Sequence, residues 1–215
     1  MTTKSDATSQ HIAASLLDIG AVTLRPHQPF TWTSGIQSPI YCDNRLTMSY
    51  PAVREQIAEG FVQWIQQHYP QVEVIAGTAT AGIPHAAWVA QKLQLPMVYV
   101  RDKAKGHGKE NLIEGVVHEG QHVVVIEDLI STGGSSLKAA QAMQAAQVHV
   151  LGVIAIFTYE FEQTRLEFQQ AGIPLHTLTS YGTLIQVALE RNQINQEDLT
   201  LLQSWRANPK AYRVN

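Results

Sequence analysis

Two adjacent carboxylates, Glu127 and Asp128, lie between an apolar run and a loop of small residues. The run, residues 123–126, is apolar throughout, which predicts a strand buried on both faces of a parallel sheet. The serine–glycine loop, residues 131–135, reads Ser-Thr-Gly-Gly-Ser. It precedes residues 137–146, which are rich in Ala and free of Gly and Pro and therefore predict a helix.

This order of groups suits a sugar phosphate. Small residues let successive backbone N–H groups point into one concavity, and the following helix adds its positive dipole end, so the loop favours a phosphate. The acidic pair would repel that phosphate and suits hydroxyl groups or a metal instead. A ribose 5-phosphate meets these demands. Neither G-x-x-x-x-G-K-[ST] nor G-x-G-x-x-G follows this strand, which excludes two common phosphate loops. A packing turn is the alternative that Gly-Gly alone would support.

A second loop of small residues, the threonine loop at residues 77–85, follows a predicted strand at 72–76. A helix up to about residue 93 comes next. A second strand–loop–helix unit of this composition predicts a second anion site. The alternative is a turn whose small residues serve only packing.

The basic loop, residues 101–111, is the one cationic cluster in a chain of formal net charge −3. A charge run is often only a solvated surface. Beside two predicted phosphate sites, it favours a lid that closes on a polyanion, excludes water and neutralises a charged leaving group. Its side chains with this potential are Arg101, Lys103, Lys105, His107 and Lys109.

Residues 118–122 match H-E-x-x-H, a zinc-protease pattern that works only on a helix. Gly120 lies in its middle, two valines precede it and an apolar strand follows directly. The stretch therefore predicts a turn between strands, not a zinc site.

The elements that must position these groups alternate between strand and helix, which predicts an α/β fold with a parallel sheet covered on both faces. The loops with chemistry then follow the carboxyl ends of strands, where open sheets bind ligands. A segment rich in Thr, Ser, Gly and Pro, residues 30–45, predicts a β-hairpin. The other expected strands are 97–100, 148–157 and 175–178, and the expected helices are 9–19, 50–68, 161–170 and two terminal helices that include 184–189 and 201–205.

Composition limits the function. The 215 residues suit a single domain, here 1–215, and 45% hydrophobic with 15% charged residues indicates a globular chain. The negative net charge offers no attraction for nucleic acid or anionic membrane. The lone cysteine, Cys42, excludes an intrachain disulfide and fits a reducing cytoplasm. The first ten residues are polar, so no signal peptide is expected, and no apolar run approaches a membrane span.

The pattern V-V-V-I-E-D-x-I-S-T-G-G-S-S resembles the binding motif of type I phosphoribosyltransferases for phosphoribosyl diphosphate (PRPP). The segment F-T-x-x-S-G-x-x-S-P-x-Y-x-D-x-R at 30–45 and V-R-x-K-x-K-x-H-G in the basic loop resemble orotate phosphoribosyltransferases. The resemblance implies the type I fold, a central parallel sheet flanked by helices, with residues 1–45 contributing a small hood over the base pocket. It also implies transfer of phosphoribosyl from PRPP to orotate, with Mg²⁺ as a cofactor that diphosphate and ribose oxygens hold and for which no protein ligand is assigned. It further implies a homodimer whose basic loop reaches the partner's active site.

The resemblance also assigns residues. It implies that Lys105, Arg101, His107 and Asp128 are catalytic and that the threonine loop holds the diphosphate. Many family members carry a lysine where Asp102 stands, and some carry one where Thr33 stands. Some use an arginine after the next strand for the orotate carboxylate, but none appears here before Arg165. Ser131 and Tyr41 are the expected orotate contacts, and the expected PRPP contacts are Arg101, Lys105, His107, Glu127, Asp128, Leu129, Ile130, Ser131, Thr132, Gly133, Gly134 and Ser135.

Two alternatives remain open at the level of sequence. A purine-type phosphoribosyltransferase would share the PRPP motif, although the hood segment and the basic loop argue against it. A non-catalytic PRPP-sensing regulator would keep the fold, but no DNA-binding domain or basic face is visible.

Overall fold

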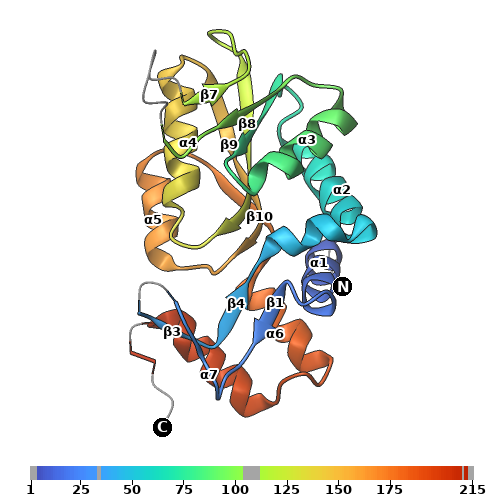
Figure 1. Ribbon diagram of the computed structural model, residues 1–215, viewed down its shortest axis with the longest axis vertical. Coiled ribbons are helices and arrows are strands. Elements are labelled where there is room, and N and C mark those ends of the chain that lie inside the picture. The colour runs from blue at the N-terminus through green and yellow to red at the C-terminus, as the bar shows by residue number, and fades with distance from the viewer. Residues whose placement is uncertain (1–3, 33–34, 104–111, 210, 213–215) are drawn as a thin grey trace.

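A six-stranded sheet forms the centre of the computed structural model, which describes residues 4–32, 35–103, 112–209 and 211–212. The strand order is β10-β9-β8-β5-β6-β7, and all neighbours are parallel except β6 and β7. Figure 1 shows helices on both sides of this sheet. The strands are β5 (Val74–Thr78), β6 (Met97–Val100), β7 (Ile113–Glu114), β8 (His122–Ile130), β9 (His149–Thr158) and β10 (Leu175–Ser180).

Apolar strands bury both faces of the sheet, as predicted. Alternate residues of each strand contribute to two cores, because successive side chains of a strand point to opposite faces. Val123 and Val125 pack in the core beneath α4 (Gly134–Ala145) and α5 (Glu162–Gln170). Val124 and Ile126 pack in the other core, beneath the remaining helices, which are α1 (Lys4–Asp18), α2 (Pro51–His68), α3 (Gly82–Leu93), α6 (Tyr181–Glu190) and α7 (Gln196–Ala207).

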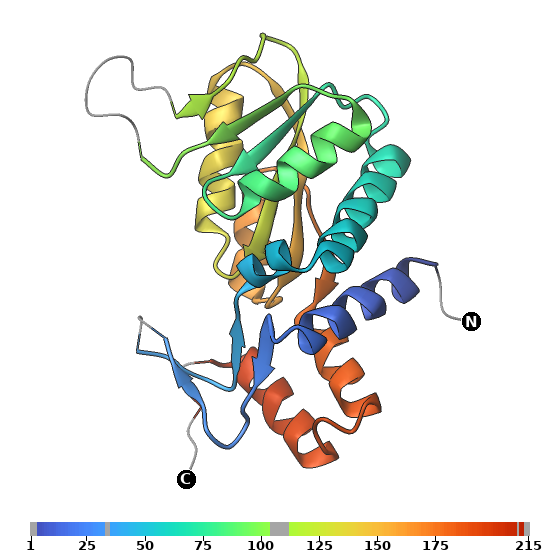
Figure 2. The same ribbon diagram turned by 45° about the vertical axis from the view of Figure 1, so that its right-hand side comes forward.

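Beyond the sheet, two short antiparallel pairs and the last two helices lie together at one end of the molecule (Figure 2). One pair is β1 (Val22–Leu24) with β4 (Ile40–Cys42), and the other is β2 (Phe30–Thr31) with β3 (Gln37–Ser38). The predicted hairpin is thus confirmed in β2 and β3. Trp205 of α7, fully buried, donates its indole N–H to the Gln37 carbonyl at 3.0 Å. The chain's late residues therefore hold its early strands in place.

Several bounds differ from the sequence prediction. Strand β8 continues through Glu127 and Asp128 to Ile130, because its residues 127–130 still pair with β9. The acidic pair therefore lies on the strand, not after it. A 3₁₀ helix, η1 (Asn44–Ser49), begins where the hairpin was expected to end, with the Asp43 side chain accepting from the Arg45 amide. Strands β1 and β7 were not predicted, because they have three and two residues and show no period.

Among the described residues, no helix is long and apolar enough to cross a membrane. The sequence prediction of no membrane span agrees with this finding.

Candidate active site

The two predicted phosphate loops are neighbours in space. Strand β5 pairs in parallel with β8, so the threonine loop and the serine–glycine loop leave the same edge of the sheet. A cleft of about 520 Å³ lies at this edge. Thr78 at the end of β5 and Ser135 at the start of α4 both line it, together with Arg101. One residue of each predicted loop thus lines this cleft, whereas Glu127 and Asp128 do not line it.

The serine–glycine loop crosses from β8 into α4. Gly133 has a φ of 75°, a left-handed conformation that glycine adopts without strain. A Cβ there would also lie 2.7 Å from the ring of Phe168, so glycine is required on two grounds. Ser131 is held by its carbonyl, which accepts from the Thr164 hydroxyl at 2.9 Å. Gly134 and Ser135 fall in the first turn of α4, where free N–H groups and the dipole favour an anion.

The acidic pair is largely buried. Glu127, only 6% exposed, accepts from the Ser136 hydroxyl and from the Asp128 amide, each at 3.0 Å. Burial, and then the neighbouring Asp128 charge, raise the pKa of Glu127 well above its ordinary value. Burial also raises the pKa of Asp128. Leu129 and Ile130 complete the strand, Ile130 with its side chain fully buried. A cation or hydroxyl donors beside these two carboxyl groups would favour their ionised forms.

The threonine loop presents its backbone close to β8. A Cβ on Gly82, the first residue of α3, would lie 2.5 Å from the Ile126 carbonyl oxygen, so only glycine permits this approach. The Ala79–Thr80 peptide bond is cis. The buried Thr78 hydroxyl lines the cleft and has no hydrogen-bond partner among the described residues. A buried hydroxyl without a partner is costly, so it suits a ligand oxygen in the cleft.

Basic side chains line the other side of the cleft. Arg101, which directly follows β6, donates to Glu114 at 3.3 Å, and Lys103 follows it along the cleft wall. Lys138 of α4 faces the same cleft. The remaining predicted lid residues, Lys105, His107 and Lys109, lie outside the described residues. The described cations thus border the edge where both loops end.

The hood segment reaches the acidic pair. The Asn44 side chain, 1% exposed, donates to the Asp128 carbonyl at 2.7 Å. Tyr41 on β4 is 46% exposed, and its ring lies 5.5 Å from that of Phe30. Tyr41 does not line the cleft described above.

Three residues with a role in this geometry were missed in the sequence. Ser136 is the next residue after the loop, and one helical turn would have placed its hydroxyl back toward the strand. Lys138 lies three residues after Ser135, on the same helical face. Asn44 carries no local signal, because its partner is 84 residues away.

The H-E-x-x-H stretch is not helical. Residues 119 and 120 form a turn, and His122 begins β8, as the sequence predicted. His122 instead bonds Glu73 at 3.0 Å and lies beside His149 of β9. The two imidazoles of the pattern therefore lack the helical geometry that a zinc protease uses.

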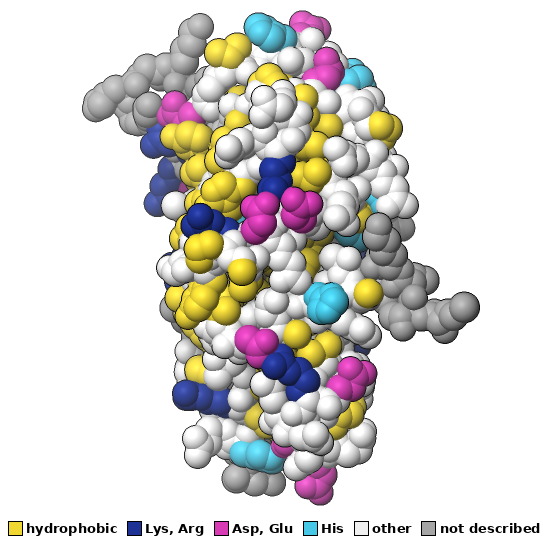
Figure 3. Space-filling view, turned by 90° about the vertical axis from the view of Figure 1, so that its right-hand side faces the viewer, with side chains coloured by type: hydrophobic (Ala, Val, Ile, Leu, Met, Phe, Trp, Pro, Cys, Tyr) yellow, Lys and Arg dark blue, Asp and Glu magenta, His cyan; other side chains and the backbone are white. Residues whose placement is uncertain are grey.

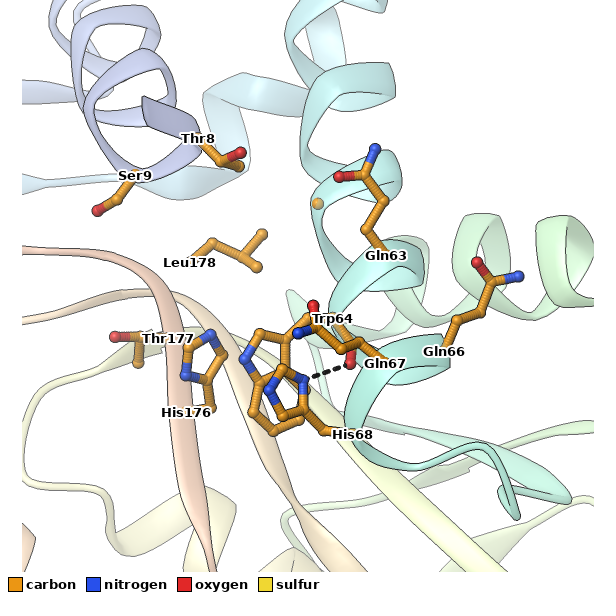
Figure 4. A pocket seen from close by; sticks show the side chains of 11 residues that line it. Thr8, Ser9, Gln63, Trp64, Gln66, Gln67, His68, His176, Thr177 and Leu178 are labelled. Carbon is orange, nitrogen blue, oxygen red and sulfur yellow. Dashed lines mark hydrogen bonds between the residues drawn. The ribbon is translucent and has the colours of Figure 1, made fainter. Parts of the chain in front are cut away.

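A second cleft, of about 880 Å³, lies between α1, α2 and β10 (Figure 4). Trp64 stacks there on His68 and on His176, each with ring centroids 4.2 Å apart. The two clefts have no lining residue in common. The larger one presents amides, hydroxyls and imidazoles and lies away from both phosphate loops, so we place the candidate active site in the smaller cleft.

The chain is similar to known proteins over most of its length. Residues 51–168 match the phosphoribosyl transferase domain family. The chain is 60% identical over 200 residues to the orotate phosphoribosyltransferase of Halalkalibacterium halodurans, covering 93% of this chain and 95% of that protein. It is 62% identical over 202 residues to the orotate phosphoribosyltransferase of Enterococcus faecalis, covering 94% and 96%.

Solved structures show the same fold. The orotate phosphoribosyltransferase of Aeropyrum pernix superimposes with a TM-score of 0.73 at 25% identity, covering 86% of this chain and 99% of that one. An adenine phosphoribosyltransferase superimposes with a TM-score of 0.60 at 20% identity, covering 78% and 99%. At that identity the second likeness concerns the fold alone. The type I fold predicted from the sequence is confirmed.

Proposed function

Because the chain belongs to the orotate phosphoribosyltransferase family, we propose that its small cleft transfers phosphoribosyl from PRPP to orotate, giving orotidine 5′-monophosphate and diphosphate. This reaction is a step of pyrimidine synthesis. The observation that carries the proposal is the single cleft shared by Thr78, Ser135 and Arg101, from the ends of two neighbouring strands and the start of α4. A molecule with a phosphate at one end and a diphosphate at the other requires such paired anion sites.

The serine–glycine loop would bind the 5′-phosphate of PRPP. The hydroxyls of Ser131, Thr132 and Ser135 add donors to the N–H groups of Gly133 and Gly134. The threonine loop would hold the diphosphate through its backbone and the Thr78 hydroxyl. The support is the helix start beside each loop and the Thr78 oxygen that no described group satisfies.

Glu127 and Asp128 would accept hydrogen bonds from the ribose 2′- and 3′-hydroxyls. As carboxylates they would also stabilise positive charge that grows on the ring in the transition state. Ser136 and the Asp128 amide already orient Glu127 for this role. Because Mg²⁺ takes one or two carboxylates together with phosphate oxygens, the donor chemistry of this pair fits the ion. Bound Mg²⁺ would neutralise charge on the diphosphate.

Arg101, Lys105 and His107 would stabilise the departing diphosphate. Arg101 lies at the cleft, whereas Lys105 and His107 are assigned from the sequence pattern. Leu129 and Ile130 would bind PRPP only through their backbone, since Ile130 is fully buried. Ser131 and Tyr41 would contact orotate, the serine from the loop and the tyrosine from the hood that residues 1–45 contribute.

A homodimer would complete the site, with the basic loop reaching the partner's cleft. Leu46 and Tyr50 are 40% and 44% exposed, and the half-buried Trp88 of α3 lies beneath the Arg54 guanidinium at 5.2 Å. Figure 3 shows hydrophobic side chains gathered along one flank of the α2–α3 face. Exposed apolar side chains with Trp and Arg are typical of protein interfaces.

The proposal includes a cytoplasmic location, with PRPP and orotate as partners and neither nucleic acid nor membrane. The only cysteine, Cys42, is buried and has no second cysteine to pair with in the chain, which fits a reducing compartment.

The test is orotate consumption by purified protein with PRPP and Mg²⁺, followed by orotate absorbance and diphosphate release. We expect turnover that needs all three components and a panel of bases in which adenine, guanine and hypoxanthine are poor substrates. Replacing Lys105 by Ala should reduce turnover by orders of magnitude with an unchanged unfolding curve. Preference for a purine base, or a PRPP-induced rise in thermal stability without diphosphate release, would overturn the proposal in favour of the other two candidates.

A further inference from the structure

The proposed reaction needs a cation for the carboxylate of orotate. Orotate differs from uracil by this group, so a site that selects orotate must balance its negative charge. Asp128, whose carbonyl accepts from Asn44 of the hood segment, carries a negative charge that opposes a second anion there. Arg101, Lys103 and Lys138 line the cleft at the phosphate loops instead. The orotate carboxylate therefore requires a further cation on the hood side.

Arg45 stands at this position. It directly follows Asn44, whose buried side chain is bonded to the Asp128 carbonyl at 2.7 Å, so the start of η1 is fixed against the acidic pair. The Arg45 side chain is 63% exposed and accessible to a ligand. Its guanidinium pKa is raised, first by the hydrogen bond to Asp43 and further by the charges of Tyr41 and Asp128. The cation thus lies within electrostatic reach of both proposed orotate-side and ribose-side residues.

Asp43 orients the guanidinium. Arg45 donates from Nε to one Asp43 carboxylate oxygen at 2.7 Å and from Nη2 to the other at 2.9 Å. A guanidinium has five N–H donors, so three remain beyond this forked pair. The fork restrains the plane of the group, and a planar guanidinium matches a carboxylate in two parallel hydrogen bonds.

We propose that Arg45 is the specificity-determining residue that binds the orotate carboxylate, and that Asp43 is its positioning residue. The inference rests on the proposed function and names the partner of the substrate group that the sequence left without one. Two other arginines compete for the role. Arg25 of the hood lies 4.8 Å over the Phe30 ring, and Arg165 of α5 pairs with Glu162 at 3.0 Å through its Nε.

The decisive measurement is steady-state kinetics of Arg45→Gln with orotate and PRPP varied separately. We expect the KM for orotate to rise roughly 10- to 100-fold, the range for losing charge-assisted hydrogen bonds. The KM for PRPP and kcat at saturating orotate should stay within about twofold of the parent values. Arg45→Lys should restore part of the affinity, since it keeps the charge and loses the fork.

Three further measurements make the test specific. Uracil, the same ring without the carboxylate, should inhibit the parent and Arg45→Gln with equal inhibition constants. Asp43→Asn should raise the orotate KM less than Arg45→Gln does. Arg25→Gln and Arg165→Gln, as matched arginine controls, should leave the orotate KM unchanged.

An unchanged orotate KM in Arg45→Gln would overturn the inference, as would a parallel loss of uracil binding, which would mean that the pocket itself had changed shape. A rise in orotate KM in Arg25→Gln or Arg165→Gln alone would transfer the role to that residue. Failure of the proposed function is distinguishable, because the parent protein would then show no PRPP-dependent orotate turnover.

Discussion

Burial of two neighbouring carboxyl groups gives the site an unusual protonation state. Glu127 lies 6% exposed beside Asp128, and burial raises the pKa of each. Before ligand binds, a proton is therefore retained on this pair at a pH where ordinary carboxyls are ionised. A cation or hydroxyl donors beside the pair would reverse this balance, since both stabilise the charged form.

Glu127→Gln should make the empty protein more stable at alkaline pH. A carboxyl whose pKa is raised by folding contributes stability below its ordinary pKa, and this contribution is lost as the pH rises from about 4.5 toward its folded value, about 9. Glutamine cannot ionise, so the Glu127→Gln variant does not lose this stability as the pH rises. We expect a gain of roughly 1–3 kcal/mol in unfolding free energy at pH 8 relative to the parent, measured by urea unfolding, with reduced turnover.

The same variant at pH 5 serves as an internal reference, because the parent carboxyl is then largely neutral. Glu162→Gln is the matched control. Its pKa is lowered by the Arg165 hydrogen bond, so removing its charge should bring no alkaline gain. If the Glu127→Gln protein is no more stable than the parent at pH 8, the raised pKa of Glu127 is contradicted.

Burial of His85 should make the folded protein less stable in acid. It is 2% exposed, and burial lowers its pKa to about 4. The unfolded chain then binds the proton more tightly, so stability is lost as the pH falls from about 6.5 toward 4. Replacing His85 by Gln should reduce the parent's loss of unfolding free energy between pH 7 and pH 5 by about 2 kcal/mol. Chemical unfolding of the parent and the variant at both pH values measures this difference.

At the scale of elements, helix α3 is pressed against strand β8. Gly82 brings the helix start to the Ile126 carbonyl, where a Cβ would lie 2.5 Å from that oxygen. Backbone cannot move aside as a flexible side chain can. The absence of a side chain at Gly82 therefore allows the threonine loop to lie close to β8.

Gly82→Ala should destabilise the protein by about 1–3 kcal/mol, the cost of overpacking, and should reduce turnover because the two loops separate. Gly134→Ala is the matched control for stability. It also lies in the first turn of a helix beside a phosphate loop, but a Cβ there meets nothing within 4 Å. Thermal unfolding of both variants measures the difference, and equal stabilities would refute the close-packing argument.

The main elements could be predicted because their signals are local. Apolar runs indicated the buried strands, and Ala-rich or amphipathic stretches indicated the helices. The end of β8 was wrong by four residues, because Glu127 and Asp128 are poor strand formers that cross-strand pairing with β9 retains. Strand β7 pairs antiparallel with β6 through two residues, and so short a pairing leaves no pattern in the sequence.

In the candidate site too, local features could be predicted from the sequence and long-range contacts could not. The serine–glycine loop carries its geometry in its own residues, so its place beside the cleft could be inferred. The bonds from Asn44 to Asp128 and from Trp205 to Gln37 join residues 84 and 168 positions apart. Such contacts depend on the folded topology, and single-sequence patterns do not specify them.

At the scale of the whole molecule, the proposed dimer predicts recovery of activity in mixtures. If Lys105 acts in the partner's cleft, each active site combines the Asp128 of one subunit with the Lys105 of the other. Lys105→Ala and Asp128→Asn dimers should each be inactive. After unfolding and refolding together in equal amounts, half the dimers are mixed, and each has one site with both defects and one with neither.

The mixture should therefore recover about a quarter of the parent turnover. The measurement is orotate consumption before and after joint refolding, with each variant refolded alone as control. No recovery, when size-exclusion chromatography shows dimers, would mean that the basic loop serves its own cleft.

The bond from Trp205 to Gln37 also has a consequence for biosynthesis. Chains fold progressively from the N-terminus as the ribosome extends them. The six central strands are all made before α7, so the sheet can assemble while residues 22–42 still lack the indole that fixes them. An unfinished polypeptide would thus carry the phosphate loops before α7 fixes the hood over the proposed base pocket, and it would select its base only once that helix is made.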